Sequence, residues 1–186
     1  MTTDFPIRTK RLLLRDVRAD DFDAIHDYAT DEAVVRFMDW GPNTIDQTRE
    51  ALDRWLVAQA EAVRLVLNLA VVVADEDRLI GSIRMAYQGQ QNADIGYSLH
   101  SAYWRRGYGA EAAGAMLELG FERFGLHRIW ATCDVRNAGS YGVMEKIGMR
   151  REGTFLQDVQ VKGRWRDTHL YAVLAQEWAA RRVEAA

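Results

Sequence analysis

The spacing of apolar residues in the first third of the chain changes from strand-like to helical. A short apolar run is followed by two stretches in which apolar residues recur three or four positions apart, for example Phe22, Ile25 and Tyr28. Pro42 lies in a turn-forming stretch between these two stretches. The pattern predicts one strand and two helices, over residues 11–17, 18–30 and 45–63.

The middle of the chain has a strand-like pattern, and the second half alternates between strand and helix. Three β-rich runs are separated by short polar breaks typical of hairpins, at 65–75, 78–88 and 92–100. The next elements are a helix over 111–125, a strand over 127–135 and a helix over 137–148. Two strands on either side of 162–165 and a terminal helix over 177–185 complete the chain. Asn137 is expected to cap its helix, and Gly125 and Gly148 to end theirs. This order predicts an α+β fold, one domain over 1–186 in which helices flank a mixed, mostly antiparallel central sheet.

Length, charge and cysteine content narrow the class of protein. The 186 residues are enough for one domain with a sizeable core, and 48% of them are hydrophobic. Lys and Arg total 24 against 27 Asp and Glu, and the resulting net charge of -3 argues against direct binding to nucleic acid. The single Cys133 excludes an intramolecular disulfide and suits a reducing compartment.

The sequence shows no sign of a targeting segment or a membrane span. Its first residues, MTTDFPIRTKRLLLRD, are charged throughout and contain no apolar signal core. No apolar run reaches the roughly 20 residues that a spanning helix needs. We therefore expect a cytoplasmic protein that does not bind a membrane.

The stretch WRRGYGAE, residues 104–111, combines arginines and glycines at the start of a predicted helix. The first N–H groups of a helix lack partners and carry the positive end of its dipole. Glycines let these groups approach a phosphate closely, and Arg105 and Arg106 add positive charge. The stretch is thus either a phosphate-binding loop or an ordinary helix entry whose arginines face water.

Two other phosphate-binding motifs fit this stretch less well. The sequence has no G-x-x-x-x-G-K-[ST] segment, so a P-loop is excluded. Gly107, Gly109 and Ala112 match the loose G-x-G-x-x-G/A pattern of dinucleotide-binding oxidoreductases. That pattern requires its first glycine directly after a strand, whereas SAYWRR intervenes here, so we keep this hypothesis only as a weak alternative.

Four segments of the chain resemble those of a known family. In chain order they are RTKRLLLRDVRADDFDAIHDY, ADIGYSLHSAYWRRGYGAEA, NAGSYGVMEKIGM and GRWRDTHLYAVLAQEW. They resemble the first strand and helix, the acetyl-CoA loop, the second cofactor motif and the closing strands of GNAT-superfamily acetyltransferases of the RimJ/RimL-like branch. The superfamily loop is usually written Q/R-x-x-G-x-G/A; Trp104, Gly107 and Gly109 stand at its fixed positions, and a tryptophan is usual in this branch. The resemblance covers nearly the whole chain.

The resemblance implies a GNAT fold and an N-acetyltransferase that moves an acetyl group from acetyl-CoA to a primary amine, by direct attack in a ternary complex. The fourth and fifth strands of that fold splay apart, and the pantetheine arm lies in the gap. The backbone N–H groups of residues 105–110 would cradle the pyrophosphate. The cofactor-binding residues that the resemblance implies are Leu99, Arg105, Arg106, Gly107, Tyr108, Gly109, Ala110, Asn137 and Ser140.

Acetyl transfer needs a proton donor for the departing thiolate. Many family members use a tyrosine in the second cofactor motif, but Met144 stands at that position here. RimL-like members carry a serine at the position of Ser140, and the resemblance assigns it to the thiol side. We therefore expect Ser140 to be the acid or to hydrogen-bond the cofactor sulfur, unless its hydroxyl serves only the first turn of its helix. Tyr141 is a second, weaker candidate.

The transfer also needs a neutral amine, and three candidates for the base stay open. Strand alternation places Asp94, Ser98 and His100 on one face. Asp94 matches an acidic position of the family and could take the amine proton through water, or could bind a cationic substrate. His100 and water itself are the alternatives. Glu111 recurs in this branch, and we interpret it as a first-turn acid that complements the helix dipole.

The sequence leaves the acceptor open, and with it a second function. The acceptor could be a protein N-terminal α-amine or a small-molecule amine, whose pocket Trp40 and Trp165 could line. The acidic residues Asp20, Asp21 and Asp23 could attract a cationic acceptor or could simply begin a solvated helix. Without the family tyrosine, a non-catalytic acyl-CoA sensor is the alternative to an enzyme. We expect no metal, because no His/Cys cluster occurs, and a homodimer is consistent with the exposed strand edges of the fold.

Overall fold

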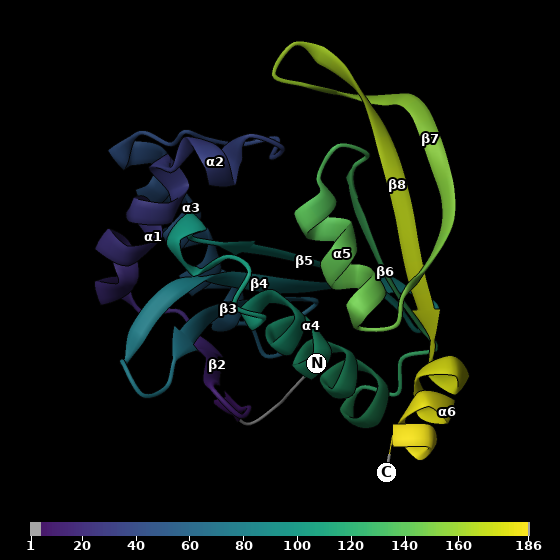
Figure 1. Cartoon of the computed structure of the whole chain (residues 1–186). Coiled ribbons are helices and arrows are strands. Elements are labelled where there is room, and N and C mark those ends of the chain that lie inside the picture. Colours follow the sequence, from purple (N-terminus) through teal and green to yellow (C-terminus); the bar gives the residue numbers. More distant parts are fainter. Residues whose placement is uncertain (1–4, 186) are drawn as a thin grey trace.

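An eight-stranded sheet runs through the computed structural model, which describes residues 5–185 and the side chains of residues 5–182 (Figure 1). Its strands follow the order β1-β2-β3-β4-β5-β6-β8-β7. Their bounds are β1 Ile7–Arg8, β2 Leu12–Asp16, β3 Val66–Val73, β4 Arg78–Gly89, β5 Asn92–Leu99, β6 Arg128–Asp134, β7 Arg150–Val161 and β8 Arg164–Leu174. Neighbouring strands pair antiparallel, except that β5 and β6 pair parallel. The predicted mixed, mostly antiparallel α+β architecture is therefore confirmed.

Helices cover both faces of the sheet. The α-helices are α1 Phe22–Thr30, α2 Glu32–Val35, α3 Ile45–Gln59, α4 Tyr108–Glu118, α5 Ala138–Lys146 and α6 Ala175–Ala185. Short 3-10 turns lie at Ala19–Asp21 and Ser101–Tyr103, and α4 continues as a π-helical turn over Leu119–Arg123. The expected caps are also present, since Asn137 begins α5 and Gly148, with a φ of 92°, follows its end.

Strand alternation divides the buried side chains into two cores. On β3, Leu69 and Val71 face the core under α4 and α5, whereas Ala70 and Val72 face the core under α1, α2 and α3. In the second core, the Tyr28 hydroxyl donates to Ser82 Oγ at 3.1 Å. The sheet is therefore a middle layer that holds the two groups of helices apart.

The pairing between β5 and β6 is short. Only Asn92–Asp94 pair with Arg128–Trp130, although both strands continue well beyond this point. The two strands separate after Asp94, and the loop after β5 leads to the start of α4. The splayed strands that the family resemblance implies are therefore present.

The structure corrects several predicted boundaries. The helix predicted over 45–63 is α3, and it ends at Gln59. The chain turns back after it, where the Arg64 guanidinium donates to the Gln59 carbonyl at 2.7 Å and pairs with Asp16. The helix predicted from 111 begins at Tyr108, because Gly107 adopts a φ of 82° and redirects the chain. The shortest strand, β1, and the shortest α-helix, α2, were not predicted.

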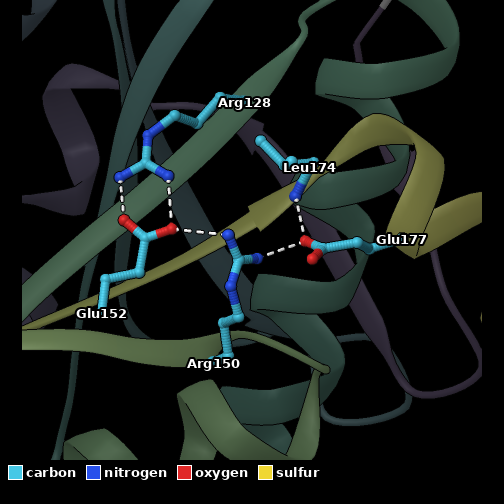
Figure 2. A network of polar contacts seen from close by, with 5 residues as sticks. All are labelled: Arg128, Arg150, Glu152, Leu174 and Glu177. Atoms are coloured by element: carbon cyan, nitrogen blue, oxygen red, sulfur yellow. Dashed lines mark hydrogen bonds and ion pairs between the residues drawn. The ribbon is translucent and has the colours of Figure 1, made fainter.

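The hairpin of β7 and β8 extends beyond the rest of the sheet and is anchored at its base (Figure 1). Figure 2 shows the anchor: Glu152 accepts from Arg128 and Arg150, and Arg150 also pairs with Glu177 of α6. The Arg128 guanidinium holds the pKa of Glu152 below its usual value, against the opposing effect of burial.

No helix among residues 5–185 is long and apolar enough to cross a membrane.

Candidate active site

A cleft of about 1120 Å³ opens where β5 and β6 separate. Its walls are the end of β5, the loop 101–107, the starts of α4 and α5, and the segment 33–38 around the end of α2. Five cationic side chains line it, namely Arg36, Arg105, Arg106, Arg136 and Lys146. Within the described part of the chain, no Asp or Glu lines this cleft, so it attracts an anionic ligand.

Two hydrogen bonds hold the loop before α4 in place. The Trp104 indole N–H donates to the Leu99 carbonyl at 2.7 Å, and Arg11 Nη1 donates to the Arg106 carbonyl at 2.9 Å. Arg105 and Gly107 both have a positive φ, of 60° and 82°. Glycine tolerates this conformation, whereas at Arg105 the two anchored neighbours must hold the backbone in it.

Gly107 is the N-cap of α4 and offers no side chain to its first N–H groups, and no other described side chain caps them. They face the cleft that Gly107, Tyr108, Gly109 and Ala110 line. A Cβ at Gly109 would lie 3.3 Å from Val143 Cγ2, so a larger residue there would press on α5. The loop therefore presents unpaired N–H groups, positive charge and close backbone access in one place.

Glu111 anchors the first turn of α4 instead of facing the cleft. Its Oε1 accepts from Thr9 Oγ1 at 2.6 Å and from the Arg11 backbone N–H at 2.7 Å, while its Oε2 accepts from Arg11 Nε at 2.7 Å. Burial alone would raise the pKa of Glu111, but these hydrogen bonds and the Arg11 charge hold it below its usual value. The contacts support a structural role.

Ser140 lines the cleft from the first turn of α5. Asn137 Oδ1 accepts from the Ser140 N–H at 3.2 Å, which caps the helix as predicted. The Tyr97 hydroxyl donates to the Ser140 carbonyl at 2.7 Å and lies 3.3 Å from Ser140 Oγ. Burial also raises the pKa of the nearby Cys133 thiol to about 11, despite a hydrogen bond between Cys133 and Ser140.

Tyr97 is a candidate that the sequence analysis did not single out. It belongs to the cleft lining, and burial raises the pKa of its phenol well above its ordinary value. Its place beside Ser140 depends on how closely β5 approaches α5, which no local pattern encodes. Tyr141, the weaker candidate, does not line the cleft and packs its ring against His169. Met144, which stands where many family members have a tyrosine, is buried in the core.

The candidate bases lie outside the cleft. Asp94 accepts from Arg84 and Gln88 on the sheet, and it is not brought together with Ser140. His100 Nδ1 accepts from the Ala102 N–H at 3.1 Å, and its Nε2 lies 3.3 Å from Asp27. Both side chains are therefore engaged by neighbours.

A second, smaller cavity of about 400 Å³ adjoins the cleft. It shares Arg36, Phe37 and Arg136 with the cleft and is completed by Asp134 and the tip of the β7–β8 hairpin, which includes Trp165. Trp165 therefore lines this cavity, whereas Trp40, the other tryptophan proposed for an acceptor pocket, packs against the core under α1 and α3.

The acidic residues near α1 do not line the cleft or the cavity. Asp21 is buried and accepts from Arg15 at 2.7 Å, whereas Asp20, in the turn before α1, and Asp23, in the first turn of α1, are exposed. They do not form a pocket for a cationic acceptor. No group of three or more His, Cys, Asp and Glu side chains among the described residues could hold a metal ion.

Comparisons with known proteins agree with this architecture. Residues 11–150 match the family model described as "Acetyltransferase (GNAT) domain". The chain is 39% identical over 173 residues to "Uncharacterized N-acetyltransferase YnaD" of Bacillus subtilis (strain 168), covering 92% of this chain and 98% of that protein.

Solved structures have the same fold. A GNAT-family acetyltransferase from Bacillus anthracis superimposes with a TM-score of 0.85 at 35% identity, over 92% of this chain and 99% of that one. A spermidine N-acetyltransferase from Vibrio cholerae, solved with CoA and spermine, gives a TM-score of 0.78 over 92% of this chain and 99% of that one. Its identity is 18%, so it shows likeness of fold alone.

Proposed function

Since this chain belongs to the GNAT family of acetyltransferases, we propose that it transfers an acetyl group from acetyl-CoA to a primary amine, by direct attack in a ternary complex. The observation that carries the proposal is the cleft itself. It brings together, in one cleft, the uncapped N-terminus of α4, five cationic side chains, Tyr97 and Ser140. The GNAT solved with CoA supports the choice of co-substrate.

The residues present fit the charge of acetyl-CoA. The N–H groups of residues 105–110, with Arg105 and Arg106, would hold the pyrophosphate at the start of α4. The pantetheine arm is uncharged and would follow the end of β5 at Leu99 toward Asn137 and Ser140. Gly109 lets α4 pack directly against Val143 of α5, which holds together the two helices beside this arm.

The chemistry proposed in the cleft balances without another reactant. The acceptor nitrogen forms a bond to the thioester carbon, the carbon–sulfur bond breaks, the nitrogen gives up one proton and the sulfur takes one. Ser140 would donate the proton or hydrogen-bond the sulfur. Tyr97 would keep Ser140 in place and, because its raised pKa keeps it protonated, could resupply that proton.

The base role proposed for Asp94 requires a water molecule. Asp94 does not line the cleft and is already paired with Arg84, so it cannot contact the acceptor amine directly. His100 and solvent water are the alternatives. An amine that reaches the cleft in its neutral form would still give up one proton after its attack, and solvent water could then accept that proton in place of a protein base.

Calorimetric titration with acetyl-CoA tests the proposal, with NAD as the control ligand. We expect saturable binding of acetyl-CoA, no response to NAD, and release of free thiol when a suitable amine is added. Binding without thiol release from a broad panel of peptides and small amines would favour the non-catalytic sensor. No binding would contradict both functions.

A further inference from the structure

The cavity beside the cleft carries more positive charge than its own residues neutralise. Its cationic side chains are Arg36, Arg136, Lys162, Arg164 and Arg166. The acid among its lining residues is Asp134, which is 2% exposed and already pairs with Arg136 at 2.6 Å. Hydrogen bonds from the Arg136 side chain, together with its charge, hold the pKa of Asp134 below its usual value, and this carboxylate is already paired within the protein.

The other cations are only partly neutralised: the Asp134 charge also acts on Arg166, and the Asp167 charge acts on Arg136. Lys162 donates to the Val35 carbonyl at 2.8 Å, a neutral group, and Arg166 Nε donates to Thr168 Oγ1 at 3.2 Å. The nearby acids of the hairpin, Asp158 and Asp167, accept from Thr168 and from the Gln157 N–H, and they do not line the cavity. An excess of positive charge therefore remains in the cavity.

The proposed co-substrate does not account for this charge. The phosphates of acetyl-CoA are all at its nucleotide end, which the proposal places at the start of α4 beside Arg105 and Arg106. Its other end is an uncharged thioester, which would lie near Ser140. The cavity adjoins the cleft through Arg36, Phe37 and Arg136. The charges that line it are therefore available to the acceptor.

We propose that this cavity binds an anionic group, a carboxylate or a phosphate, carried by the amine that is acetylated. The inference rests on the proposed acetyl transfer and specifies its acceptor. Guanidinium groups recognise both anions with paired hydrogen bonds. The volume of about 400 Å³ fits a small molecule or one acidic side chain, and Phe37 and Trp165 supply apolar walls. A polyamine, which is cationic throughout, is disfavoured.

Binding to the CoA-saturated protein tests the cavity separately from the cleft, because CoA then occupies the other cationic site. The probes are matched amines: β-alanine against 3-aminopropanol, O-phosphoethanolamine against ethanolamine, and spermidine as the cationic member. A pentapeptide amide that begins with two glutamates, compared with its glutamine twin, tests a peptide source. We expect at least one anionic member to bind about tenfold or more tightly than its neutral partner.

Variants then locate the binding. Arg164→Gln and Arg166→Gln should each weaken the anionic probe about tenfold, while Arg166→Lys should recover part of the loss. Both residues line the cavity and not the cleft, so CoA affinity should stay unchanged. Arg54→Gln removes the same charge from the exposed side of α3 and is the matched control.

Thiol release with the same amines separates the two proposals. Faster transfer to an anionic amine, lost in Arg166→Gln, supports both. Transfer that prefers neutral amines or spermidine overturns the anionic acceptor and leaves the acetyltransferase intact. Equal binding of the anionic and neutral members also overturns it. Tight anion binding with no thiol release from any amine would support an anion site in the cavity and contradict the proposed acetyl transfer.

Discussion

The Tyr97 hydroxyl donates a hydrogen bond to the Ser140 carbonyl at 2.7 Å, across the place where β5 and β6 no longer pair. Beyond this place, the sheet supplies no backbone hydrogen bonds between the two strands. The side chain of one strand instead contacts the first turn of the helix that follows the other. The contact thus fixes the width of the cleft at the point where we place the reaction.

Replacing Ser140 should slow the reaction more than it weakens the co-substrate. In Ser140→Ala we expect turnover to fall about a hundredfold, because a positioned acid is lost, with a much smaller change in acetyl-CoA affinity. Steady-state kinetics and calorimetry measure the two quantities. Tyr97→Phe is the companion variant and should show a milder loss, since Ser140 remains. Unchanged turnover in Ser140→Ala would refute its acid role.

The loop prediction concerns Gly107. Gly107→Glu should abolish measurable acetyl-CoA binding, because its backbone has a φ of 82° and its new side chain would start 3.3 Å from Arg11 Nη2, where the carboxylate would compete for the cation that anchors the loop. Gly153→Glu, at an open position of β7 without a positive φ, is the matched control and should bind normally. Circular dichroism confirms that both variants are folded. Retained affinity in folded Gly107→Glu would place the ligand elsewhere.

The identity of the base can be read from the pH dependence of the rate. If Asp94 takes the amine proton through water, Asp94→Asn should flatten the rising limb of the profile of kcat/KM. His100→Gln is measured beside it, because this side chain is the other candidate. A flattened limb in His100→Gln alone would transfer the role, and two unchanged profiles would leave solvent water as the base.

The carboxylate of Glu111 should make stability depend on pH. Its pKa is lowered in the folded state, so its contribution is fully present above the usual value of 4.5 and is lost as the pH falls through the folded value. Denaturation of Glu111→Gln should show a loss of about 1–3 kcal/mol at neutral pH that shrinks in acid.

Glu118→Gln provides the control for this measurement. Glu118 lies on the same helix with its side chain 56% exposed, and its Oε1 is 3.8 Å from Arg182. Such a surface pair contributes little, so the variant should differ from the parent by less than about 1 kcal/mol at any pH. A constant loss in Glu111→Gln across the pH range would show that packing, not charge, explains it.

Local pattern was enough to predict much of the fold. The apolar spacing on β3 to β5, the capping residue Asn137 and the helix-ending Gly148 act within a few residues of themselves, and each stands where it was expected. The glycine loop could likewise be recognised from its own residues. These features were predictable because their physical causes, hydrogen bonds to near neighbours and allowed backbone angles, are local.

Only the tertiary structure decided which residues far apart in the chain come into contact. Tyr97 meets Ser140 because β5 diverges from β6, and the cations of the second cavity come from α2, the end of β6 and the hairpin tip, which are far apart in the chain. Asp94 fits a local motif, yet the neighbouring strand provides Arg84 to pair with it. Burial and ion pairing depend on such distant partners. The sequence by itself therefore determined most of the elements and the glycine loop before α4, and the packing determined which charges and side chains line the cleft and the cavity.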